Sequence, residues 1–320
     1  MRRDFMKKTV NSKNLIFTIL LTLVLLLQAS LLALAAEPAP GVLILKVDRD
    51  DLSQLPKDFR TPSDAFKQAT ADGQIPSRVG MDKLKISGSS YFSQLEFTKM
   101  LTKLPVNHVV VLDLRLESHG YLDGTGVSWY SAYKRANWGK SDAELDKIEK
   151  KLLNSTLAGP VEVARLAADK SIASKAELNV AHALTEGELA TLLGVKYTRI
   201  HVADYTKPSD QNVDQFLSFY QALPKDAWLH LHCEAGEGRT TVFMAMVDML
   251  HNAKRVSYDD IMSRQWLIGG QDIRIATSSD ALKKVGYADR AAFTKHFYDY
   301  VIHRPNKSMT WTEWAKQYKD

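Results

Sequence analysis

The chain has 320 residues but only one cysteine, Cys233, which excludes a fold held together by internal disulfide bonds. Its nine histidines are scattered, and neither an HExxH-like motif nor a cysteine–histidine ligand spacing occurs, so we predict no metal site. Internal repeats and low-complexity tracts are also missing. A chain of this length buries a sizeable core, so its stability must come from packing.

Long hydrophobic runs are missing from the chain except near its start. Basic residues at positions 2, 3, 7, 8 and 13 precede an apolar run from Leu15 to Leu34, which overlaps a small-x-small pattern at Ala33–Ala35. This order predicts a signal peptide over residues 1–35, with export to the periplasm or the cell exterior and no membrane contact after cleavage. The run is also close to the length that spans a bilayer, so an uncleaved anchor is the alternative.

A large charge of one sign is also missing once this segment is set aside. Residues 1–35 hold five of the 42 basic residues and one of the 37 acidic residues, which leaves 37 basic and 36 acidic side chains. A nearly neutral chain has no general basic field for nucleic acid, so we predict no such partner. Any preference for an anionic substrate must be built from local side chains. The sequence carries no signal for the oligomeric state.

Apolar strands and amphipathic helices alternate through most of the chain, which is typical of an α/β fold. The segment "HVVVLDLR" (His108–Arg115) is a near-continuous apolar strand, and such strands are buried on both faces of a sheet covered by helices. Further strands are predicted at 41–47, 160–166, 197–202 and 227–233, and helices at 93–104, 141–153, 185–194, from 210 onward, and at 240–251. We therefore predict a central mixed or parallel sheet flanked by helices.

The region between Gly120 and Lys196 is longer than one crossover connection needs. It begins with a stretch rich in Gly, Tyr and Trp, and differs in composition from the segments around it. We predict a small inserted β-rich accessory region at 120–196. It divides the core into an N-terminal part at 36–119 and a catalytic part at 197–320.

The cysteine lies in "LHLHCEAGEGRTT" (Leu229–Thr241), where an apolar strand leads through a glycine-spaced turn into a helix. Successive backbone N–H groups and the positive end of a helix dipole make such a turn a cradle for a phosphate-sized anion. Gly236 and Gly238 allow the close approach and the positive φ values that a cradle needs. The same surroundings favour the thiolate form of Cys233, which indicates a nucleophile in an anion site.

Three further side chains suit this chemistry. Arg239 provides a planar fork that can hold two phosphoryl oxygens, and Thr240 can donate a hydrogen bond to the sulfur. A leaving alkoxide also needs a general acid. In "HVADYTKPSD", Asp204 follows a strand and starts a proline-containing loop, which makes it the first candidate. Asp210 is the second candidate, although a helix cap explains it better.

The stretch "HCEAGEGRTT" matches the His-Cys-x5-Arg-Thr pattern of the protein-tyrosine-phosphatase superfamily. Together with "DLRLESHGYLDG", "VSWY", "ANWGKS" and "RQWLIGG", it resembles the bacterial PTP-like phytases, cysteine-dependent phosphatases of inositol polyphosphates. The similarity runs from about Pro56 to the C-terminus. The resemblance implies a PTP-like fold whose accessory domain is a partial β-barrel, in keeping with the insertion.

That resemblance implies Cys233 as nucleophile with His232 orienting it, Arg239 as phosphate clamp, Thr240 as leaving-group helper and Asp204 as general acid. It implies that the backbone of the turn and basic residues outside it hold the phosphates of an inositol ring. The expected substrate-binding residues are Arg60, Tyr205, Glu234, Ala235, Gly236, Glu237, Gly238, Lys283 and Arg290. No cofactor is expected, since the guanidinium and the amides supply the charge stabilisation.

Three residues differ from the usual family pattern. Glu237 adds a carboxylate to the cradle, where it either points to solvent or discourages the most highly charged substrates. Tyr205 stands where a histidine is common, and Lys134 stands where a close relative has an acidic residue. These differences leave open which phosphate is removed first.

Two other segments allow two interpretations each. The polar residues of "DLRLESHG" either form a buried network that supports the site or contact the substrate directly; they are Asp113, Arg115, Glu117 and His119. Gln265 either positions the attacking water or is a surface or turn residue. His230 and His232 share one strand face, where a bound metal would compete with the thiolate.

The sequence thus predicts an exported phosphatase that hydrolyses myo-inositol polyphosphates such as phytate through a cysteinyl-phosphate. A phosphatase for phosphotyrosine or phosphoinositides, using the same turn, is the first alternative. A module that binds polyphosphates without hydrolysing them is the second, and a sulfurtransferase is a weaker third.

Overall fold

The computed structural model describes residues 42–67, 70, 73–104, 108–306 and 308–317. The expected signal peptide at 1–35 lies outside these residues, so cleavage and the alternative of an anchor both stay predictions. Among the described helices, none combines the length and the apolar character that crossing a membrane requires.

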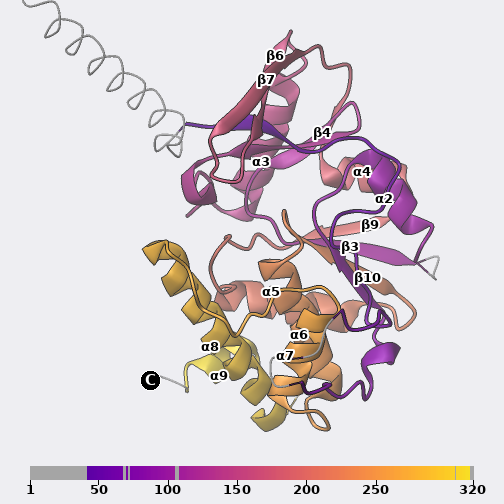
Figure 1. Ribbon diagram of the computed structural model, residues 1–320, viewed down its shortest axis with the longest axis vertical. Helices are drawn as coiled ribbons and strands as arrows, with labels where there is room; N and C mark the ends of the chain where they lie inside the picture. Colours follow the sequence, from indigo (N-terminus) through magenta and orange to yellow (C-terminus); the bar gives the residue numbers. More distant parts are fainter. Residues whose placement is uncertain (1–41, 68–69, 71–72, 105–107, 307, 318–320) are drawn as a thin grey trace, which may run out of the picture.

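A four-stranded parallel sheet carries the cysteine turn (Figure 1). Its strands follow the order β2 (Ile86–Ser89), β10 (Trp228–His232), β3 (Val109–Asp113) and β9 (Lys196–Arg199), and each neighbouring pair is parallel. Both β3 and β10 are buried along their whole length, as their continuous apolar runs predict. The residues that follow β10, β3 and β9 therefore meet at one edge of the sheet.

Helices cover both faces of this sheet. On one face α5 (Asp210–Ala222) and α6 (Gly238–Asn252) pack against alternate residues of β3 and β10. On the other face α2 (Gln94–Leu101) and α4 (Glu186–Leu192) pack against Val111 of β3. The alternation of side chains along each strand thus supplies two apolar layers, and the predicted α/β class with a sheet flanked by helices is confirmed.

The helix α6 is surrounded by other elements. Its residues from Arg239 to Met249 are all buried, and α7 (Tyr258–Leu267), α8 (Ala281–His303) and α9 (Trp311–Ala315) complete the core around it. A central helix fixed on every side holds its N-terminus, which starts at Gly238, in one position relative to β10.

The second sheet has six strands and forms the upper part of Figure 1. Their order is β7 (Ile172–Leu178), β6 (Val161–Leu166), β1 (Ile44–Arg49), β5 (Thr125–Tyr130), β4 (His119–Leu122) and β8 (Ala183–Leu184). All neighbours are antiparallel except β1 and β6. The end strands β7 and β8 do not pair with each other, so the described strands form no closed barrel.

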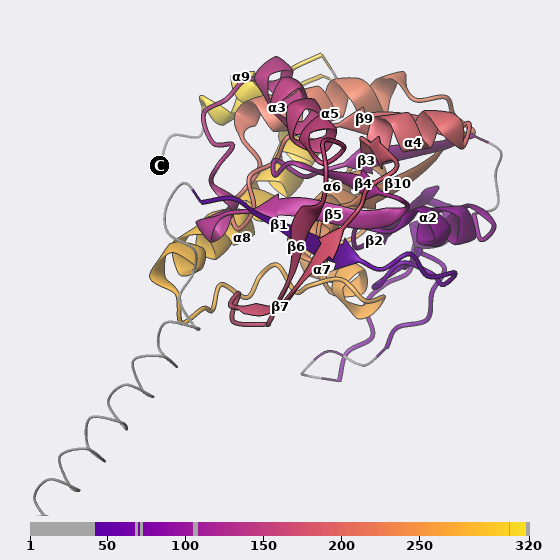
Figure 2. The ribbon, with the colours of Figure 1, turned by 90° about the horizontal axis from the view of Figure 1, so that it is seen from above.

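The helix α3 (Asp142–Ser155) packs on the six-stranded sheet through Leu153, which joins Leu122, Val127 and Trp129 in a small core. Its N-terminus has the capping box that Ser141 and Glu144 predict. Figure 2 looks down on this sheet, with β1 and β5 crossing the middle of the view.

The strand β1 comes from the segment that the sequence assigns to the core, but it pairs with β5 and β6. It therefore belongs to the accessory sheet and not to the four-stranded one. The sequence could not show this, because a single apolar run does not reveal its partner strands. The boundary numbers of the predicted insertion otherwise remain a prediction.

Candidate active site

Cys233 directly follows β10, and the turn at 234–237 leads from it to Gly238, where α6 begins. Ligands of parallel α/β sheets bind at the carboxyl ends of the strands, and β10 lies between two neighbours in its sheet. The hydroxyl of Thr240, in the first turn of α6, donates a hydrogen bond to the sulfur of Cys233 at 3.2 Å. The thiol is 3% exposed, so helix, hydroxyl and backbone surround it closely.

Two glycines shape this turn for different reasons. Gly236 has φ +75°, and a Cβ atom there would lie 2.4 Å from the backbone nitrogen of Ser90. A Cβ atom on Gly238 would lie 2.3 Å from Nη1 of Arg290. The first glycine is needed for backbone conformation and close packing, and the second leaves room for a cation beside the helix N-terminus.

The guanidinium of Arg239 is buried and oriented by one carboxylate. Its Nη1 and Nη2 atoms donate to Oε2 and Oε1 of Glu117, each at 2.8 Å, and Nη1 also donates to the carbonyl of Val202 at 3.1 Å. Its Nε is buried without a hydrogen-bond partner in the described protein, which leaves one donor for a ligand oxygen. Glu117 comes from "DLRLESHG", and its contact with Arg239 supports the interpretation of this segment as a buried network that holds the site in place.

Glu117 remains ionised although it is buried. Burial acts to raise its pKa, but the guanidinium of Arg239 and that of Arg115 outweigh this effect and hold the pKa well below its usual range. Arg115 also donates from Nε to Glu117 at 3.1 Å. The clamp is therefore a fixed salt-bridged fork, not a mobile surface arginine.

Asp204 lies beside this fork in the loop after β9. Its Oδ2 is 3.4 Å from Nη2 of Arg239 and contacts the ammonium of Lys134, and its Oδ1 accepts from the backbone N–H of Tyr205 at 2.9 Å. Burial acts to raise the pKa of Asp204, but Arg239 and Lys134 together hold it below its usual value. The expected acid and the expected clamp are thus neighbours.

The other residues of the turn differ in where their side chains lie. Glu234 accepts from Lys46 of β1 at 2.9 Å and also contacts Lys134, whereas Ala235 and Glu237 are exposed. Of the two interpretations of Glu237, the structure supports a carboxylate directed to solvent. Backbone N–H groups remain as the means by which this turn can bind an anion.

His232 belongs to a buried network beneath the turn. Its Nε2 lies 2.8 Å from Oε1 of Glu186, the first residue of α4, and Oε2 of Glu186 lies 3.2 Å from Nε2 of His119. The same nitrogen of His119 is 3.2 Å from Asp113, which Arg199 also contacts. Sequence reasoning missed Glu186. The sequence shows only that it follows the helix cap Thr185, and its partners His119 and His232 come from other segments.

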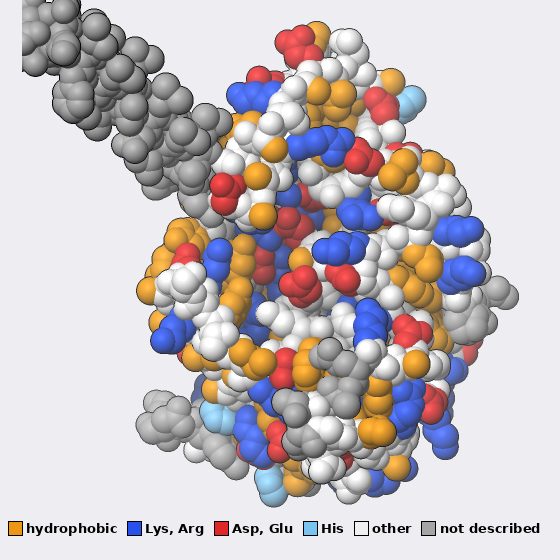
Figure 3. Space-filling model, in the orientation of Figure 1, with side chains coloured by type: hydrophobic (Ala, Val, Ile, Leu, Met, Phe, Trp, Pro, Cys, Tyr) orange, Lys and Arg blue, Asp and Glu red, His pale blue; other side chains and the backbone are white. Residues whose placement is uncertain are grey.

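Tyr205 and Lys283 lie on the rim of the site, with the ammonium of Lys283 4.8 Å from the centroid of the Tyr205 ring. Arg290, also on α8, is buried and donates from Nε to the carbonyl of Thr206 at 3.2 Å. The helix α8 thus brings two of the expected cations to the general-acid loop. Figure 3 shows a hollow between the six-stranded sheet and α8, with acidic and basic side chains at its floor.

A pocket of about 410 Å³ adjoins the turn on the side of β1. Its lining includes Glu234 and Ala235 of the turn and basic side chains from three segments, which are Lys46, Arg49, Lys57 and Lys170. This pocket extends the candidate site toward the accessory sheet. Its Lys46 side chain donates a hydrogen bond to Glu234 of the turn.

Arg60 and Gln265 are less exposed than loop or turn residues usually are. Arg60 is 1% exposed, and its Nη2 donates to Thr241 of α6 at 3.1 Å, so it supports the helix that carries Arg239. Burial lowers its pKa to about 10. Gln265 is buried in α7 and donates to Asp248 at 2.8 Å, which excludes a surface position. Direct contact of either residue with substrate stays a prediction.

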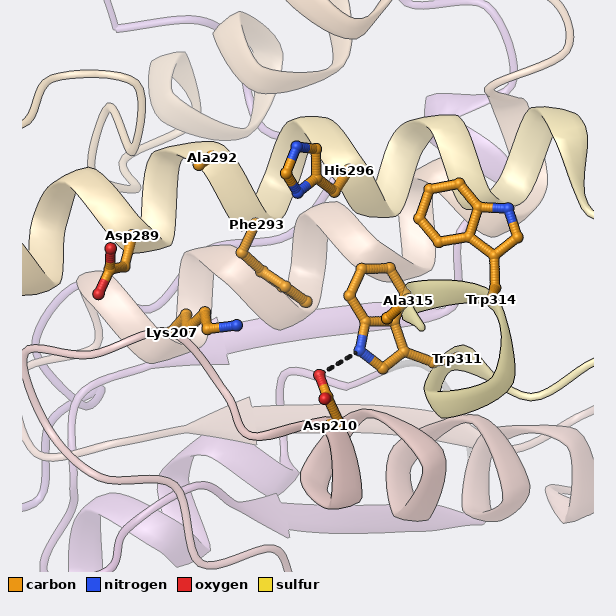
Figure 4. Close-up of a pocket in the computed structure, with 9 residues that line it drawn as sticks. All are labelled: Lys207, Asp210, Asp289, Ala292, Phe293, His296, Trp311, Trp314 and Ala315. Carbon is orange, nitrogen blue, oxygen red and sulfur yellow. Dashed lines mark hydrogen bonds between the residues drawn. The ribbon is translucent and has the colours of Figure 1, made fainter. Parts of the chain in front are cut away.

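Asp210 begins α5 and accepts from the indole N–H of Trp311 at 2.8 Å. It lines a pocket of about 270 Å³ between α5, α8 and α9, together with Lys207 and Asp289 (Figure 4). Neither Cys233 nor Arg239 lines this pocket. Asp210 therefore has a structural partner, and Asp204 is the candidate acid.

Two groups of side chains bring their ligand-type atoms within 4.8 Å of one another, namely Asp113, Glu186 and His232, and Glu117, Asp204 and Glu234. Each group already has protein cations at ion-pair distance: Arg199 in the first, Lys134 and Arg239 in the second. Protein side chains thus balance these carboxylates.

Comparisons with known proteins agree with this geometry. The family model of PTP-like phytases, described by inositol hexakisphosphate, matches residues 112–251. The PTP-like myo-inositol phosphatase of Mitsuokella multacida, solved with myo-inositol-(1,3,4,5)-tetrakisphosphate, is 41% identical with a TM-score of 0.84, covering 88% of this chain and 48% of that one. A curated relative, effector protein hopD2 of Pseudomonas syringae pv. tomato, is 29% identical over 267 residues, which is 80% of this chain and 56% of that protein.

The chain therefore spans about half the length of these two relatives. It spans nearly all of a third one, a PTP-like phytase from Bdellovibrio bacteriovorus. That structure is 31% identical with a TM-score of 0.66, and the match covers 88% of this chain and 98% of that one. The chain belongs to the PTP-like phytase family.

Proposed function

We propose that the protein hydrolyses phosphomonoesters of myo-inositol polyphosphates, such as phytate, through a cysteinyl-phosphate intermediate. One observation carries the proposal: a cysteine at a helix N-terminus, with Thr240 on its sulfur, shares its site with Arg239 and Asp204 only 3.4 Å apart. Family membership supports the substrate class. The inositol tetrakisphosphate bound to the Mitsuokella relative supports it further.

In the first step the thiolate of Cys233 attacks phosphorus. The Sγ–P bond forms as the bond from phosphorus to the ester oxygen breaks, and that oxygen takes a proton from Asp204. In the second step Asp204 takes a proton from water, the water oxygen bonds to phosphorus, and the Sγ–P bond breaks. The Thr240 hydroxyl stabilises the departing thiolate, and the backbone amides with Arg239 stabilise the phosphoryl oxygens.

The ligand-free site holds Asp204 as a carboxylate, whereas the first step needs the acid. A bound phosphate resolves this, because its negative charge sits beside Arg239 and weakens the pull of that cation on Asp204. The pKa of Asp204 then rises, and the residue takes up a proton when substrate binds. Acid catalysis is in this way coupled to the presence of a phosphoryl group.

Cations around the turn would hold the other phosphates of the ring. Lys283 and Arg290 lie on the α8 side, and the pocket beside β1 offers Lys57 and Lys170 on the other. A highly phosphorylated ring is therefore a better match than a phosphotyrosine side chain, which carries one phosphate on a flat ring. We further propose that the protein is exported, on the basis of the predicted signal peptide.

The proposal is tested with Cys233→Ser and with product analysis. The wild-type protein releases phosphate from phytate, and turnover on phytate exceeds that on a phosphotyrosine peptide. Cys233→Ser keeps the fold and binds phytate but releases no phosphate. Phosphate release by this variant would overturn the covalent mechanism, and faster turnover on the peptide would overturn the substrate assignment. Binding of phytate without hydrolysis by the wild type would leave only a binding module.

A further inference from the structure

Lys134 occupies an unusual piece of backbone at the edge of the site. Lys134 and its neighbour Tyr133 have φ values of +56° and +52°, and both lie in the short helical turn Ala132–Lys134. Non-glycine residues seldom adopt positive φ, and two in succession persist only where the surroundings enforce them. Such backbone concentrates at functional sites, which directs attention to the side chain that it places.

The ammonium of Lys134 lies among three carboxylates. It contacts Asp204 and Glu234, it is 3.9 Å from Glu117, and it lies 5.5 Å from the centroid of the Tyr205 ring. Lys134 is only 7% exposed. A buried lysine with this many acidic neighbours acts as the central cation of the group.

The three carboxylates depend on Lys134 to different degrees. Glu117 keeps Arg115 and Arg239 as partners without it, and Glu234 keeps Lys46 at 2.9 Å. Asp204 keeps Arg239 at 3.4 Å and the backbone N–H of Tyr205 at 2.9 Å, but the fork of Arg239 is directed at Glu117. Loss of the ammonium would therefore affect Asp204 most.

We infer that Lys134 is a positioning residue for the general acid: its ammonium fixes the Asp204 carboxylate between Arg239 and Glu234 and sets the pH range in which Asp204 can donate a proton. The inference rests on the proposed function for the role of Asp204, and the contacts themselves are independent of it.

Several charged groups face Asp204 from the elements around it. Arg239 of α6, Lys134 of the short helical turn and Glu117 of the β3–β4 segment act on it most strongly, and Arg290 of α8 and Glu234 of the cysteine turn lie in the same cluster. Burial raises the pKa of Asp204, Arg239 and Lys134 lower it, and Glu117 raises it. Removing the positive charge of Lys134 therefore moves the pKa of Asp204 upward.

The sign of the kinetic effect follows from this. A general acid must be protonated, so its pKa determines the alkaline limb of the profile of kcat/KM against pH. A higher pKa moves that limb to higher pH in Lys134→Gln. A carboxylate that is no longer held in place also transfers its proton less effectively, so kcat on alkyl phosphates falls by roughly 10- to 100-fold.

The first measurement needs no turnover. The carboxyl carbon of Asp204 is titrated by 13C NMR in the wild type, Lys134→Gln, Lys134→Met and Lys134→Arg, with assignment by Asp204→Asn. The pKa rises in the two neutral variants and stays low in the arginine variant. An unchanged pKa in a folded neutral variant overturns the inference. If neither neutral variant folds, a raised pKa in Lys134→Arg also overturns it, because the charge is kept there.

The second measurement compares two leaving groups. An alkyl phosphate needs protonation of its leaving oxygen, whereas an activated aryl phosphate does not. Lys134→Gln loses activity on glycerol phosphate and phytate but changes by less than about threefold on an aryl phosphate, and its alkaline limb on the alkyl esters shifts upward. Equal losses on both classes indicate a merely structural role and overturn the inference.

Lys207→Gln is the matched control. It removes a positive charge from the same loop as Asp204, but its side chain lines the separate pocket of Figure 4. This variant keeps the wild-type profile; an equal upward shift would mean that general charge, not the contact, is responsible. If phytate is not a substrate at all, the proposed function fails while the NMR titration and the two simpler esters still decide the role of Lys134.

Discussion

Two clusters of acidic side chains lie near the cysteine turn, and they differ in burial. The first, beneath the turn, joins Asp113, Glu186 and His232 in the protein interior, where each is less than 2% exposed. The second joins Glu117 and Asp204 to Glu234 of the cysteine turn, and two of its three members are partly exposed. In both clusters the carboxylate or imidazole atoms lie within 4.8 Å of one another. Only the second cluster is partly exposed, so only its side chains can contact a molecule that enters from solvent.

This contrast separates stability from chemistry. Charges in the interior are strongly destabilising when one partner is removed, since the remaining charge has no solvent. Partly exposed charges can be solvated by water when a partner is lost, so changing them alters reactivity more than folding. The inner cluster should therefore control stability and the outer one turnover.

The largest effect is expected for Asp204→Asn in the outer cluster. It removes the proposed general acid, so kcat on alkyl phosphates falls by about 10² to 10⁴-fold. The free energy of unfolding falls by less than in Glu186→Gln, because Lys134 keeps Glu234 and Arg239 keeps Glu117 as partners. Steady-state kinetics and urea unfolding test both parts; a loss in kcat below tenfold would contradict the role of Asp204.

Glu186→Gln in the inner cluster should show the opposite balance. It leaves His119 and His232 without one of their carboxylate partners, so the free energy of unfolding falls by roughly 3 kcal/mol. Glu162→Gln, which breaks the exposed pair with Lys175, is the control and changes stability by less than about 1 kcal/mol. Similar losses in the two variants would show that the buried network does not behave as described.

The inner cluster also makes stability depend on pH. Burial lowers the pKa of His119, but Asp113 outweighs this and raises it to about 9 from its ordinary 6.5. Its protonated form therefore stabilises the fold fully below pH 6.5, and this contribution is lost as the pH rises through about 9. Wild-type protein should lose more stability over this range than His119→Gln, as measured by urea unfolding. Parallel curves for the two proteins would argue against a protonated His119.

The smallest effect is expected at Glu237. Its side chain is exposed, so Glu237→Gln removes a solvated charge near the cradle. The KM for phytate falls by no more than about threefold, and kcat stays unchanged. A fall in KM of tenfold or more would show that this carboxylate does discourage highly charged substrates.

The cysteine turn is the part of the candidate site that the sequence predicts well. Strand, glycines, cysteine, arginine and threonine are adjacent in the chain, so local backbone rules place them together. The α/β class follows equally from the buried strand at 109–113. Asp204 is predictable because its loop follows a strand of the same parallel sheet.

The partners of these residues are less predictable, because they depend on contacts between distant segments. Nothing local to Glu186 indicates that it reaches His119 and His232, and nothing in "PKDFR" indicates that Arg60 is buried against Thr241. The pairing of β1 with β5 and β6 is a further case. Strand register and the packing of α4 decide these contacts, and periodicity carries no information about either.

The contacts of the cysteine turn reach both ends of the described chain. Lys46 of β1 binds Glu234, and Arg290 of α8 fills the space beside Gly238. During synthesis β1 is made before Cys233, but Cys233 exists for some time before Arg290 of α8 is added. A chain that has not yet gained α8 lacks the finished turn, so the proposed phosphate transfer would begin only after this helix has docked.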